Sequence, residues 1–352
     1  MKKIRVGVIG AGSWTVASHL PNLARHDDVE FVAVARRGAD MLSKIQREWN
    51  FPVASEDYRD VLAEGVDVCI VASPSGLHYE HASAALRAGA HVMCEKPFTI
   101  DPQQAWEIDR LSKDCGREVV VAFGWNYRPM VQQAKKLMDE VGIGALEHMT
   151  VHMSSVTREL LSNTGAYPDA APETIPEPGT WTDRSMSGGG YGQAQLSHAL
   201  GLALWLTGAR AQSAFALMTA PIPAPVELHD AVTYRFDNGA IGVMAGTSAH
   251  LNGWGNRHSL EVRGVGSEGQ FLIDVEREAF WLFSKGQDHK LTIPEGDGLY
   301  DCVGPIDAIL AAARGVGFVN QSPAELGART VEALDLAYRS ADSGMPEDRN
   351  LR

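Results

Sequence analysis

The sequence predicts an α/β protein with two domains: a doubly wound parallel sheet, then an α+β domain with a largely antiparallel open sheet. Strand-like and helix-like segments alternate between residues 4 and 123, as they do in a parallel sheet covered by helices. A glycine-rich turn follows the first strand-like segment. Beyond residue 145, strand-like segments follow one another with few helices between them, which indicates antiparallel pairing. We expect the first domain over residues 1–124 and the second over residues 125–352.

Composition and charge indicate a globular protein whose main partner is a small molecule. The 352 residues are 45% hydrophobic and 21% charged, with a formal net charge of −13. This acidic balance argues against nucleic acid or an anionic membrane as the main partner. The sequence has no signal-peptide pattern, no membrane-spanning apolar stretch, and four cysteines without Cys-x-x-Cys spacing. We expect a cytoplasmic protein with reduced, buried thiols and no metal site.

The first strand, over residues 4–9, runs directly into a glycine-rich turn and a helix that extends to Ala24. Strand, glycine turn and helix form the context that a Rossmann dinucleotide site requires. The first glycine makes the tight turn, the second lets the backbone approach the pyrophosphate, and the helix N-terminus favours the anion. Thr15 stands where a third glycine would allow close packing, so helix and strand are expected slightly further apart. The residues expected to bind the dinucleotide here are Gly10, Gly12, Ser13, Trp14 and Thr15.

The second strand, over residues 30–35, ends in Arg36 and Arg37. An NAD site usually has a carboxylate here, about 20 residues after the glycines, to hold the ribose 2′-hydroxyl. Two arginines offer bidentate contacts to a 2′-phosphate instead. This favours NADP(H) over NAD(H), which stays the alternative cofactor. The two arginines would otherwise be solvated residues at the start of a loop.

The alternation continues to the end of the first domain. Helices are expected over residues 40–49, 58–63, 79–88 and 102–115, and strands at Val53 and over residues 66–72, 92–94 and 119–123. The fourth strand ends in a loop that begins a helix, and such a loop is a natural wall for a cofactor. The loop residues expected to contact the cofactor are Ser73, Pro74, Ser75 and His78.

Glu95 and Lys96 follow the buried strand 92–94, and Pro97 ends it. Ligands of open α/β sheets bind outside the carboxyl ends of the strands, so this pair points to a ligand crevice. A lysine at such an edge has its charged form disfavoured and can serve as acid or base near neutral pH. A surface ion pair at the strand end is the alternative.

Taken in this order, the motifs resemble those of the Gfo/Idh/MocA oxidoreductases, which include glucose-fructose oxidoreductase and inositol dehydrogenases. The resemblance spans the chain and rests on the glycine turn with Ser73-Pro74…His78, Ala88-Gly89-Ala90-His91-Val92 and Cys94-Glu95-Lys96-Pro97. It implies that Lys96 contacts the nicotinamide ribose and the substrate hydroxyl. It also implies that Asn126, in a hinge over residues 124–129, holds the nicotinamide end, and that Tyr300 reaches back to the cofactor. For Tyr300, a packing aromatic is the alternative.

The second domain begins with an amphipathic helix over residues 130–141. Its expected strands cover residues 146–156, 212–218, 231–236, 241–248, 259–263, 270–274, 279–284 and 290–293. Asp237-Asn238-Gly239 predicts a hairpin turn, and later helices are expected over residues 305–313 and 324–340. A polar, proline-rich segment over residues 157–180 is expected to be a loop, either a lid, an assembly element or a tolerated insertion. The family resemblance implies that one face of the sheet forms a homodimer or homotetramer contact.

His198 lies on a helix that follows three glycines and ends at Leu206. The resemblance implies a family motif with an aspartate and then a histidine on one helical face, and His198 matches the histidine. Ala194 stands in the place of the aspartate, beside Gln195. A glutamine can bind a sugar hydroxyl but cannot take a proton. Proton transfer is therefore expected to depend on Lys96 and His198, and the substrate to differ from that of a typical inositol dehydrogenase.

These features predict an NADP(H)-preferring oxidoreductase acting on a secondary alcohol or ketone of a sugar, glycoside or cyclitol. Lys96 relays the hydroxyl proton while hydride moves to nicotinamide C4, and His198 exchanges a proton and fixes the substrate. Glu95 orients Lys96 or the cofactor. The other residues expected around the substrate and nicotinamide are Asn126, Tyr127, Arg128, Trp181 and Gln195.

Two other functions stay open at this point. In the first, a recycled NAD cofactor oxidises the sugar transiently before elimination, so that turnover is redox-neutral. In the second, the protein is a non-catalytic regulator that senses a sugar or NADP. The presence of Lys96 and His198 favours catalysis, whereas the missing aspartate favours the regulator.

Overall fold

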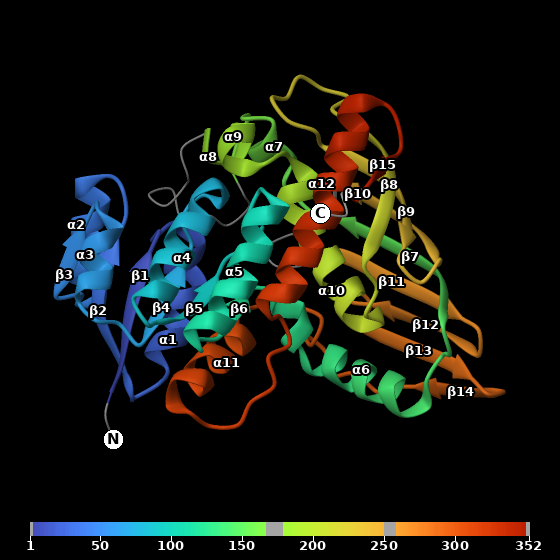
Figure 1. The fold of residues 1–352 in the computed structure, drawn as a ribbon, viewed down its shortest axis with the longest axis horizontal. Helices are drawn as coiled ribbons and strands as arrows, with labels where there is room; N and C mark the ends of the chain where they lie inside the picture. Colours follow the sequence, from blue (N-terminus) through green and yellow to red (C-terminus); the bar gives the residue numbers. More distant parts are fainter. Residues whose placement is uncertain (1–2, 167–178, 250–257, 350–352) are drawn as a thin grey trace.

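The computed structural model describes residues 3–166, 179–249 and 258–349 of the chain. Figure 1 shows a parallel sheet with its helices at one end of the molecule and an open sheet at the other. The long helix α12 (Ala324–Ser343) lies between them, where it contacts both α5 (Pro102–Cys115) and strand β8 (Ala211–Thr219). The predicted α/β fold, with a parallel sheet followed by a mostly antiparallel one, is confirmed.

The first sheet has six parallel strands in the order β3-β2-β1-β4-β5-β6. The order reverses direction between β1 and β4, and such a switch point is where an open α/β sheet binds its ligand. The apolar residues of the central strands are almost fully buried, as expected for a sheet covered on both faces. The strands are β1 (Ile4–Ile9), β2 (Val29–Ala35), β3 (Val53–Ser55), β4 (Val68–Val71), β5 (His91–Cys94) and β6 (Val119–Val121).

Local sequence signals set the helices of this half. Asp57 and Asp101 accept backbone N–H groups at the starts of α3 (Tyr58–Ala63) and α5, and Gly116 ends α5 in the left-handed conformation. The other elements are the π-helical turn η1 (Thr15–His19), α1 (Leu20–Ala24), α2 (Ala39–Trp49), the 3₁₀ turn η2 (Ser75–Leu77) and α4 (His78–Arg87). Helix α11 (Val303–Arg314) comes from late in the chain and packs against β5 and β6.

The second sheet has nine strands in the order β14-β13-β12-β11-β7-β10-β9-β8-β15. Every neighbouring pair is antiparallel except β7 with β10. Helices α10 (Ser197–Thr207) and α12 pack on one face. The strands are β7 (Leu146–Ser154), β8, β9 (His229–Phe236), β10 (Ile241–Thr247), β11 (Ser259–Gly266), β12 (Gly269–Asp274), β13 (Ala279–Ser284), β14 (Gln287–Lys290) and β15 (Glu347–Asp348).

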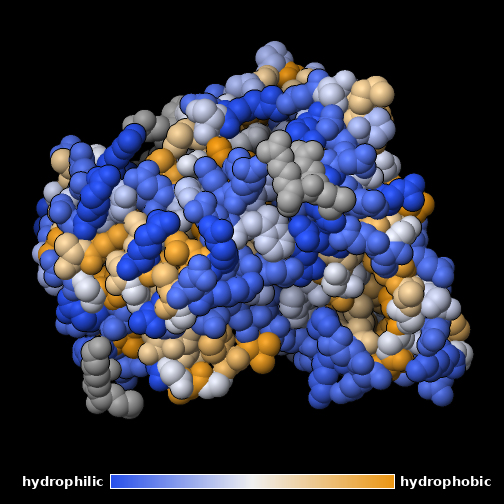
Figure 2. All heavy atoms as spheres, in the orientation of Figure 1, coloured by the Kyte–Doolittle hydropathy of each residue, from blue (hydrophilic) through white to orange (hydrophobic). Residues whose placement is uncertain are grey.

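The opposite face of the nine-stranded sheet leaves large apolar side chains exposed. Leu217 is 67% exposed and Ile241 51% exposed, and they lie on the outer sides of β8 and β10 beside Phe215 and Val243. The face of the molecule in Figure 2 is by contrast mainly hydrophilic. No helix in the described ranges combines the length and the apolarity needed to cross a membrane.

Two expectations for the second half need correction. The last strand was expected over residues 290–293, but β14 spans Gln287–Lys290. Lys285 and Gly286 both have positive φ (52° and 76°), and this two-residue turn sends the chain straight back along β13. The expected loop over 157–180 contains two short helices, α7 (Arg158–Leu161) and α8 (Gly179–Thr182). The centre of that loop lies outside the described residues, so its role stays a prediction.

Candidate active site

Gly10 holds the end of β1 against the end of β4, at the switch point of the parallel sheet. Its φ is +94°, and a Cβ on Gly10 would lie 2.2 Å from the backbone nitrogen of Ser73. At Gly12, by contrast, a Cβ would meet no atom within 4 Å. The turn is therefore closed towards the neighbouring strand. At Gly12 it is open, so that a dinucleotide pyrophosphate can approach the protein backbone there.

Thr15, in the place of the third glycine, is buried and its hydroxyl donates to the Gly10 carbonyl at 2.9 Å. The helix starts here as the π-helical turn η1, with one residue more in the turn than an α-helix has. Trp14, directly before this turn, packs its ring against that of Tyr300 with 5.6 Å between ring centres. The glycine turn therefore lies beside aromatic residues that come from the far end of the chain.

Arg36 lies next to the glycine turn. Its Nη1 donates to the Ala11 carbonyl at 3.1 Å and its Nε to the Arg37 carbonyl at 3.0 Å, and the side chain is half-buried. Arg37 is exposed. Of the two expected arginines, the structure therefore places Arg36 against the dinucleotide turn and leaves Arg37 on the solvent side.

The loop after β4 is tied to the segment that carries Lys96. The ring of His78 lies between the carbonyl oxygens of Ser73 (2.7 Å) and Pro97 (2.8 Å). The hydroxyl of Ser73 contacts His81 Nδ1 at 2.8 Å. Pro74 and Ser75 begin η2. His78 therefore joins two loops, and the direct cofactor contact expected for it stays a prediction.

Lys96 is half-buried. Its Nζ donates to the Ala194 carbonyl at 2.9 Å. Ala194 belongs to the π-helical turn η5 (Gly192–Leu196) before α10, and a π turn adds a residue without adding a hydrogen bond, so it can leave a carbonyl for an outside donor. Burial lowers the pKa of Lys96, and the charge of Glu95 opposes that shift. An amine in this environment can take up and release a proton nearer neutrality than an exposed lysine.

Glu95 does not bond to the ammonium group of Lys96. One carboxylate oxygen accepts the backbone N–H of Lys96 at 2.9 Å, and the other lies 2.7 Å from His19 Nε2. Although burial opposes it, this hydrogen bond with His19 and the nearby positive charge of Lys96 lower the pKa of Glu95 overall. Glu95 is therefore ionised at neutral pH and fixes the backbone of Lys96.

His198 lies in an aromatic cluster at the base of the site. Its ring centre is 5.2 Å from Trp125 and 4.8 Å from Tyr300, and the side chain is 5% exposed. Burial, followed by the charge of Lys96, holds the pKa of His198 well below its usual range. Its Nδ1 is buried and has no hydrogen-bond partner within the described residues. His198 is therefore a neutral imidazole that is affected by the charge of Lys96, and one of its ring nitrogens is buried without a hydrogen-bond partner in the described residues.

Other expected residues have polar groups committed elsewhere. The Tyr300 hydroxyl donates to the Ala122 carbonyl at 2.9 Å, so only its ring faces the cluster. Tyr127 contacts Ser322 through its hydroxyl at 3.0 Å. Arg128 pairs with Asp297 and Asp301 and donates to the carbonyl of Gly296. These contacts hold the hinge to the segments around 300 and 320.

Asn126 and Trp181 each present a buried polar atom without a partner in the described part of the chain. Asn126 donates from Nδ2 to the Gln321 carbonyl at 3.1 Å, while its Oδ1 has no donor. The same holds for Nε1 of Trp181, on α8. Gln195 is buried on η5, one residue after the carbonyl that holds Lys96. Buried unsatisfied groups of this kind fit a site that a polar ligand completes.

Three residues around the site were not predicted from the sequence: His19, Cys302 and Glu227. The donor atoms of His19, Glu95 and Cys302 lie within 4.8 Å of one another. We interpret this group as a hydrogen-bonded pair beside a thiol rather than a metal centre. Glu95 already contacts His19 directly at 2.7 Å, and burial raises the pKa of Cys302, so the thiol stays protonated.

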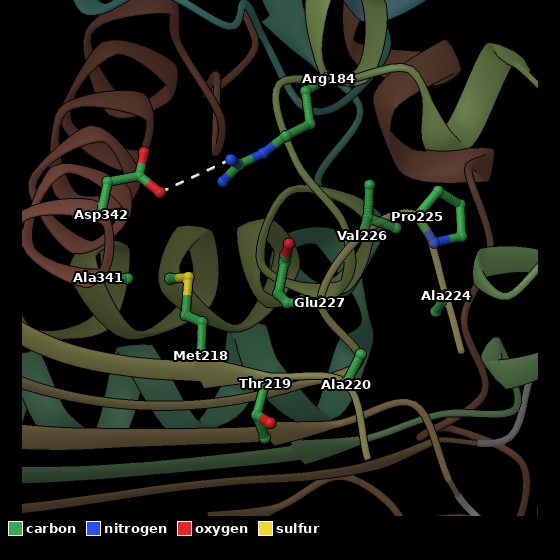
Figure 3. Close-up of a pocket in the computed structure, with 10 residues that line it drawn as sticks. All are labelled: Arg184, Met218, Thr219, Ala220, Ala224, Pro225, Val226, Glu227, Ala341 and Asp342. Carbon is green, nitrogen blue, oxygen red and sulfur yellow. Dashed lines mark ion pairs between the residues drawn. The ribbon is translucent and has the colours of Figure 1, made fainter. Parts of the chain in front are cut away.

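Glu227 supports the glycine turn before η5 from behind. It accepts the N–H groups of Gly190 (2.7 Å) and Gly192 (3.2 Å) and the hydroxyl of Tyr338, which in turn accepts the N–H of Gln193. Figure 3 shows Glu227 in the wall of a surface pocket of about 250 Å³ whose rim carries the ion pair between Arg184 and Asp342. Glu227 thus connects the pocket wall with the glycines that precede Ala194.

Asp230 is buried close to Glu227. It is 4% exposed, and burial, followed by the charge of Glu227, holds the pKa of Asp230 well above its usual range. A carboxyl whose pKa is higher in the folded state favours folding below its unfolded-state pKa of about 4 and loses that contribution as pH rises through its folded-state pKa. We therefore expect Asp230→Asn, which cannot ionise, to raise Tm at pH 8 by roughly 2–4 °C, with a smaller gain at pH 5.

Thermal unfolding at the two pH values measures this effect. The exposed Asp114→Asn variant serves as a charge-matched control and should leave Tm nearly unchanged at both. Equal shifts of Asp230→Asn at pH 5 and pH 8 would show that Asp230 is not held in its protonated form.

Comparisons with known proteins identify the family. Residues 4–123 match the model described as "Oxidoreductase family, NAD-binding Rossmann fold", and residues 131–271 match the "GFO/IDH/MocA C-terminal domain". This chain belongs to the Gfo/Idh/MocA family. The family predicted from the glycine turn and the Glu95-Lys96-Pro97 motif is thus confirmed.

Several relatives within this family carry names of sugar dehydrogenases. D-Glucoside 3-dehydrogenase of Escherichia coli K12 is 31% identical over 188 residues, which cover 53% of this chain and 49% of that protein. This chain therefore matches about half the length of that relative. Levoglucosan dehydrogenase of Pseudarthrobacter phenanthrenivorans is 26% identical over 311 residues, which cover 79% of this chain and 75% of that protein.

The solved structure of levoglucosan dehydrogenase in complex with NADH and levoglucosan superimposes with a TM-score of 0.78 and 21% identity. The superposition covers 99% of this chain and 100% of the levoglucosan dehydrogenase chain. GenD2 from gentamicin A biosynthesis, in complex with NAD, gives a TM-score of 0.77 at 20% identity. At such identities the superpositions establish the shared fold, which extends over both sheets.

Proposed function

We propose that this protein is a dehydrogenase or reductase that transfers hydride between a nicotinamide cofactor and a secondary alcohol or ketone of a sugar, glycoside or cyclitol. The observation that carries the proposal is the placement of Lys96. Its half-buried side chain follows β5 at the carboxyl edge of the parallel sheet, its pKa is lowered, and a neutral imidazole, His198, lies close by. The sugar-dehydrogenase names of the relatives support the substrate class.

The cofactor, when bound, accepts or supplies the hydride at nicotinamide C4. Lys96, as the neutral amine, takes the proton of the substrate hydroxyl, and the new ammonium group is stabilised by the Ala194 carbonyl and the charge of Glu95. His198 binds the same or a neighbouring hydroxyl through its ring and orients it. The open side of Gly12, the half-buried Arg36 and the Asn126 Oδ1 hold the dinucleotide.

Arg36 supports NADP(H) as the preferred cofactor, because a cation lies where an NAD site usually has a carboxylate. The relatives do not point to one cofactor. Three solved complexes of levoglucosan dehydrogenase contain NADH, whereas a D-xylose 1-dehydrogenase of Haloferax volcanii is named for NADP(+). We further propose that the protein works as a homodimer or homotetramer through the apolar outer face of β8 and β10, and that it is cytoplasmic.

A cofactor titration followed by a substrate screen tests the proposal. The purified protein is titrated with NADPH and NADH, and the better cofactor is then offered with glucosides, anhydrosugars, free aldoses and inositols while absorbance at 340 nm is recorded. A net change in reduced cofactor with at least one sugar is the expected result. Sugar turnover without such a change would support the recycled-cofactor alternative, and ligand binding without turnover would support the regulator.

A further inference from the structure

His19, on the first helix after the glycine turn, contacts Glu95, the residue directly before Lys96. His19 is fully buried and its Nε2 lies 2.7 Å from one carboxylate oxygen of Glu95. The second oxygen of Glu95 accepts the backbone N–H of Lys96 at 2.9 Å. A single carboxylate thus connects the first helix of the dinucleotide turn with the residue that carries the reactive amine.

His19 is the last residue of the π-helical turn that begins at Thr15. Residues four apart lie on nearly the same face of a helix, and Thr15 and His19 are both buried. The same turn is anchored at its start, where the Thr15 hydroxyl bonds to the Gly10 carbonyl. An unbroken series of contacts therefore leads from the glycine turn through His19 and Glu95 to Lys96.

Each of the titratable groups around this pair interacts with Glu95 or with Lys96. Glu95 is the nearest opposite charge, and it raises the pKa of Lys96 against the effect of burial. His19 in turn lowers the pKa of Glu95 and so keeps that charge present. The other titratable groups that interact with Glu95 or Lys96 are His78 on α4, Tyr300 and Cys302 directly before α11, and His198 on α10.

We propose that His19 is a positioning residue for the reaction: it holds Glu95 ionised against the backbone of Lys96 and thereby sets the charge and the place of the catalytic amine. The inference rests on the proposed function only in naming Lys96 as the proton-transfer group. Loss of His19 leaves a buried carboxylate without its donor, which raises the pKa of Glu95. The neutral Glu95 no longer supports the ammonium form, and the pKa of Lys96 falls further.

Two substitutions of His19 distinguish positioning from packing. His19→Leu keeps a similar volume and removes the donor, whereas His19→Gln places an amide N–H near Glu95. We expect His19→Leu to lower kcat about 10- to 100-fold with the Kd for the cofactor within about threefold, and His19→Gln to recover most of the loss. His289→Ala, on the edge strand β14, is the control and should behave as wild type.

The titration of Lys96 gives a readout that does not depend on turnover. Lysine is labelled with ¹³C at the ε carbon, the Lys96 signal is assigned by its loss in Lys96→Arg, and its pKa is read without substrate. His19→Leu and Glu95→Gln should each lower it by about one unit, and the double variant should lower it no further, because both remove the same charge. Additive shifts, or an unchanged Lys96 pKa in folded His19→Leu, would overturn the proposal. A wild type that turns over no sugar would refute the proposed function and leave this result standing.

Discussion

Lys96→Ala is expected to reduce kcat by about 10³-fold while cofactor binding and folding are kept. The half-buried amine is placed to accept the hydroxyl proton, and general acid–base catalysis by a positioned side chain contributes roughly 10²- to 10⁴-fold. The loss should appear in kcat rather than in KM, because proton transfer occurs in the transition state. Steady-state kinetics with the sugar found in the screen measure both constants.

The pH dependence gives a second check on this variant. In the oxidative direction the wild-type rate should rise with pH through the lowered pKa of Lys96, since only the neutral amine accepts a proton. Lys96→Ala should lack that limb. Lys136→Ala, at an exposed position of α6 (Pro129–Val141), is the control and should keep full activity. If Lys96→Ala retains wild-type kcat, Lys96 has no part in proton transfer.

The parallel half of the fold was predictable because each signal is local. The helices over 58–63 and 102–115 begin after aspartates that cap them, and the observed bounds agree with the expected ones. The strands β1, β4 and β5 were visible as buried apolar runs between turn residues. The position of β14 was missed because apolar residues at 291 and 293 suggested a strand, whereas the turn at Lys285 and Gly286 set the register.

The candidate site was predictable only in part, because side-chain partners depend on the folded arrangement. Glu95 and Lys96 are neighbours in sequence, which suggested that they act on one another, but the carboxylate turns to His19, 76 positions away. A histidine four residues after Thr15 carries no signal in one sequence, because nothing near it in the chain shows that it meets Glu95. Likewise, nothing in the sequence indicates that Arg128 pairs with Asp297 and Asp301. These ion pairs hold its guanidinium at the hinge.

Arg36→Ala is expected to weaken NADP(H) binding about 10- to 100-fold and to leave NAD(H) binding within about threefold. Hydrogen bonds to a charged group contribute about 1.5–3 kcal/mol each, which corresponds to this range. The guanidinium lies against the Ala11 carbonyl of the dinucleotide turn, so a 2′-phosphate at the end of β2 would meet it without a large movement. Titrations with NADPH and NADH, followed by nicotinamide fluorescence, measure both affinities.

Two further arginines define how local this effect is. Arg37→Ala should weaken NADP(H) binding less than Arg36→Ala does, because Arg37 is exposed and the structure places only Arg36 against the glycine turn. Arg25→Ala removes an exposed charge elsewhere and should change neither affinity. If wild type binds NADH as tightly as NADPH and Arg36→Ala changes neither, the contacts of Arg36 only fix the loop after β2. The absence of a 2′-phosphate pocket would then favour NAD(H), the cofactor of the redox-neutral alternative.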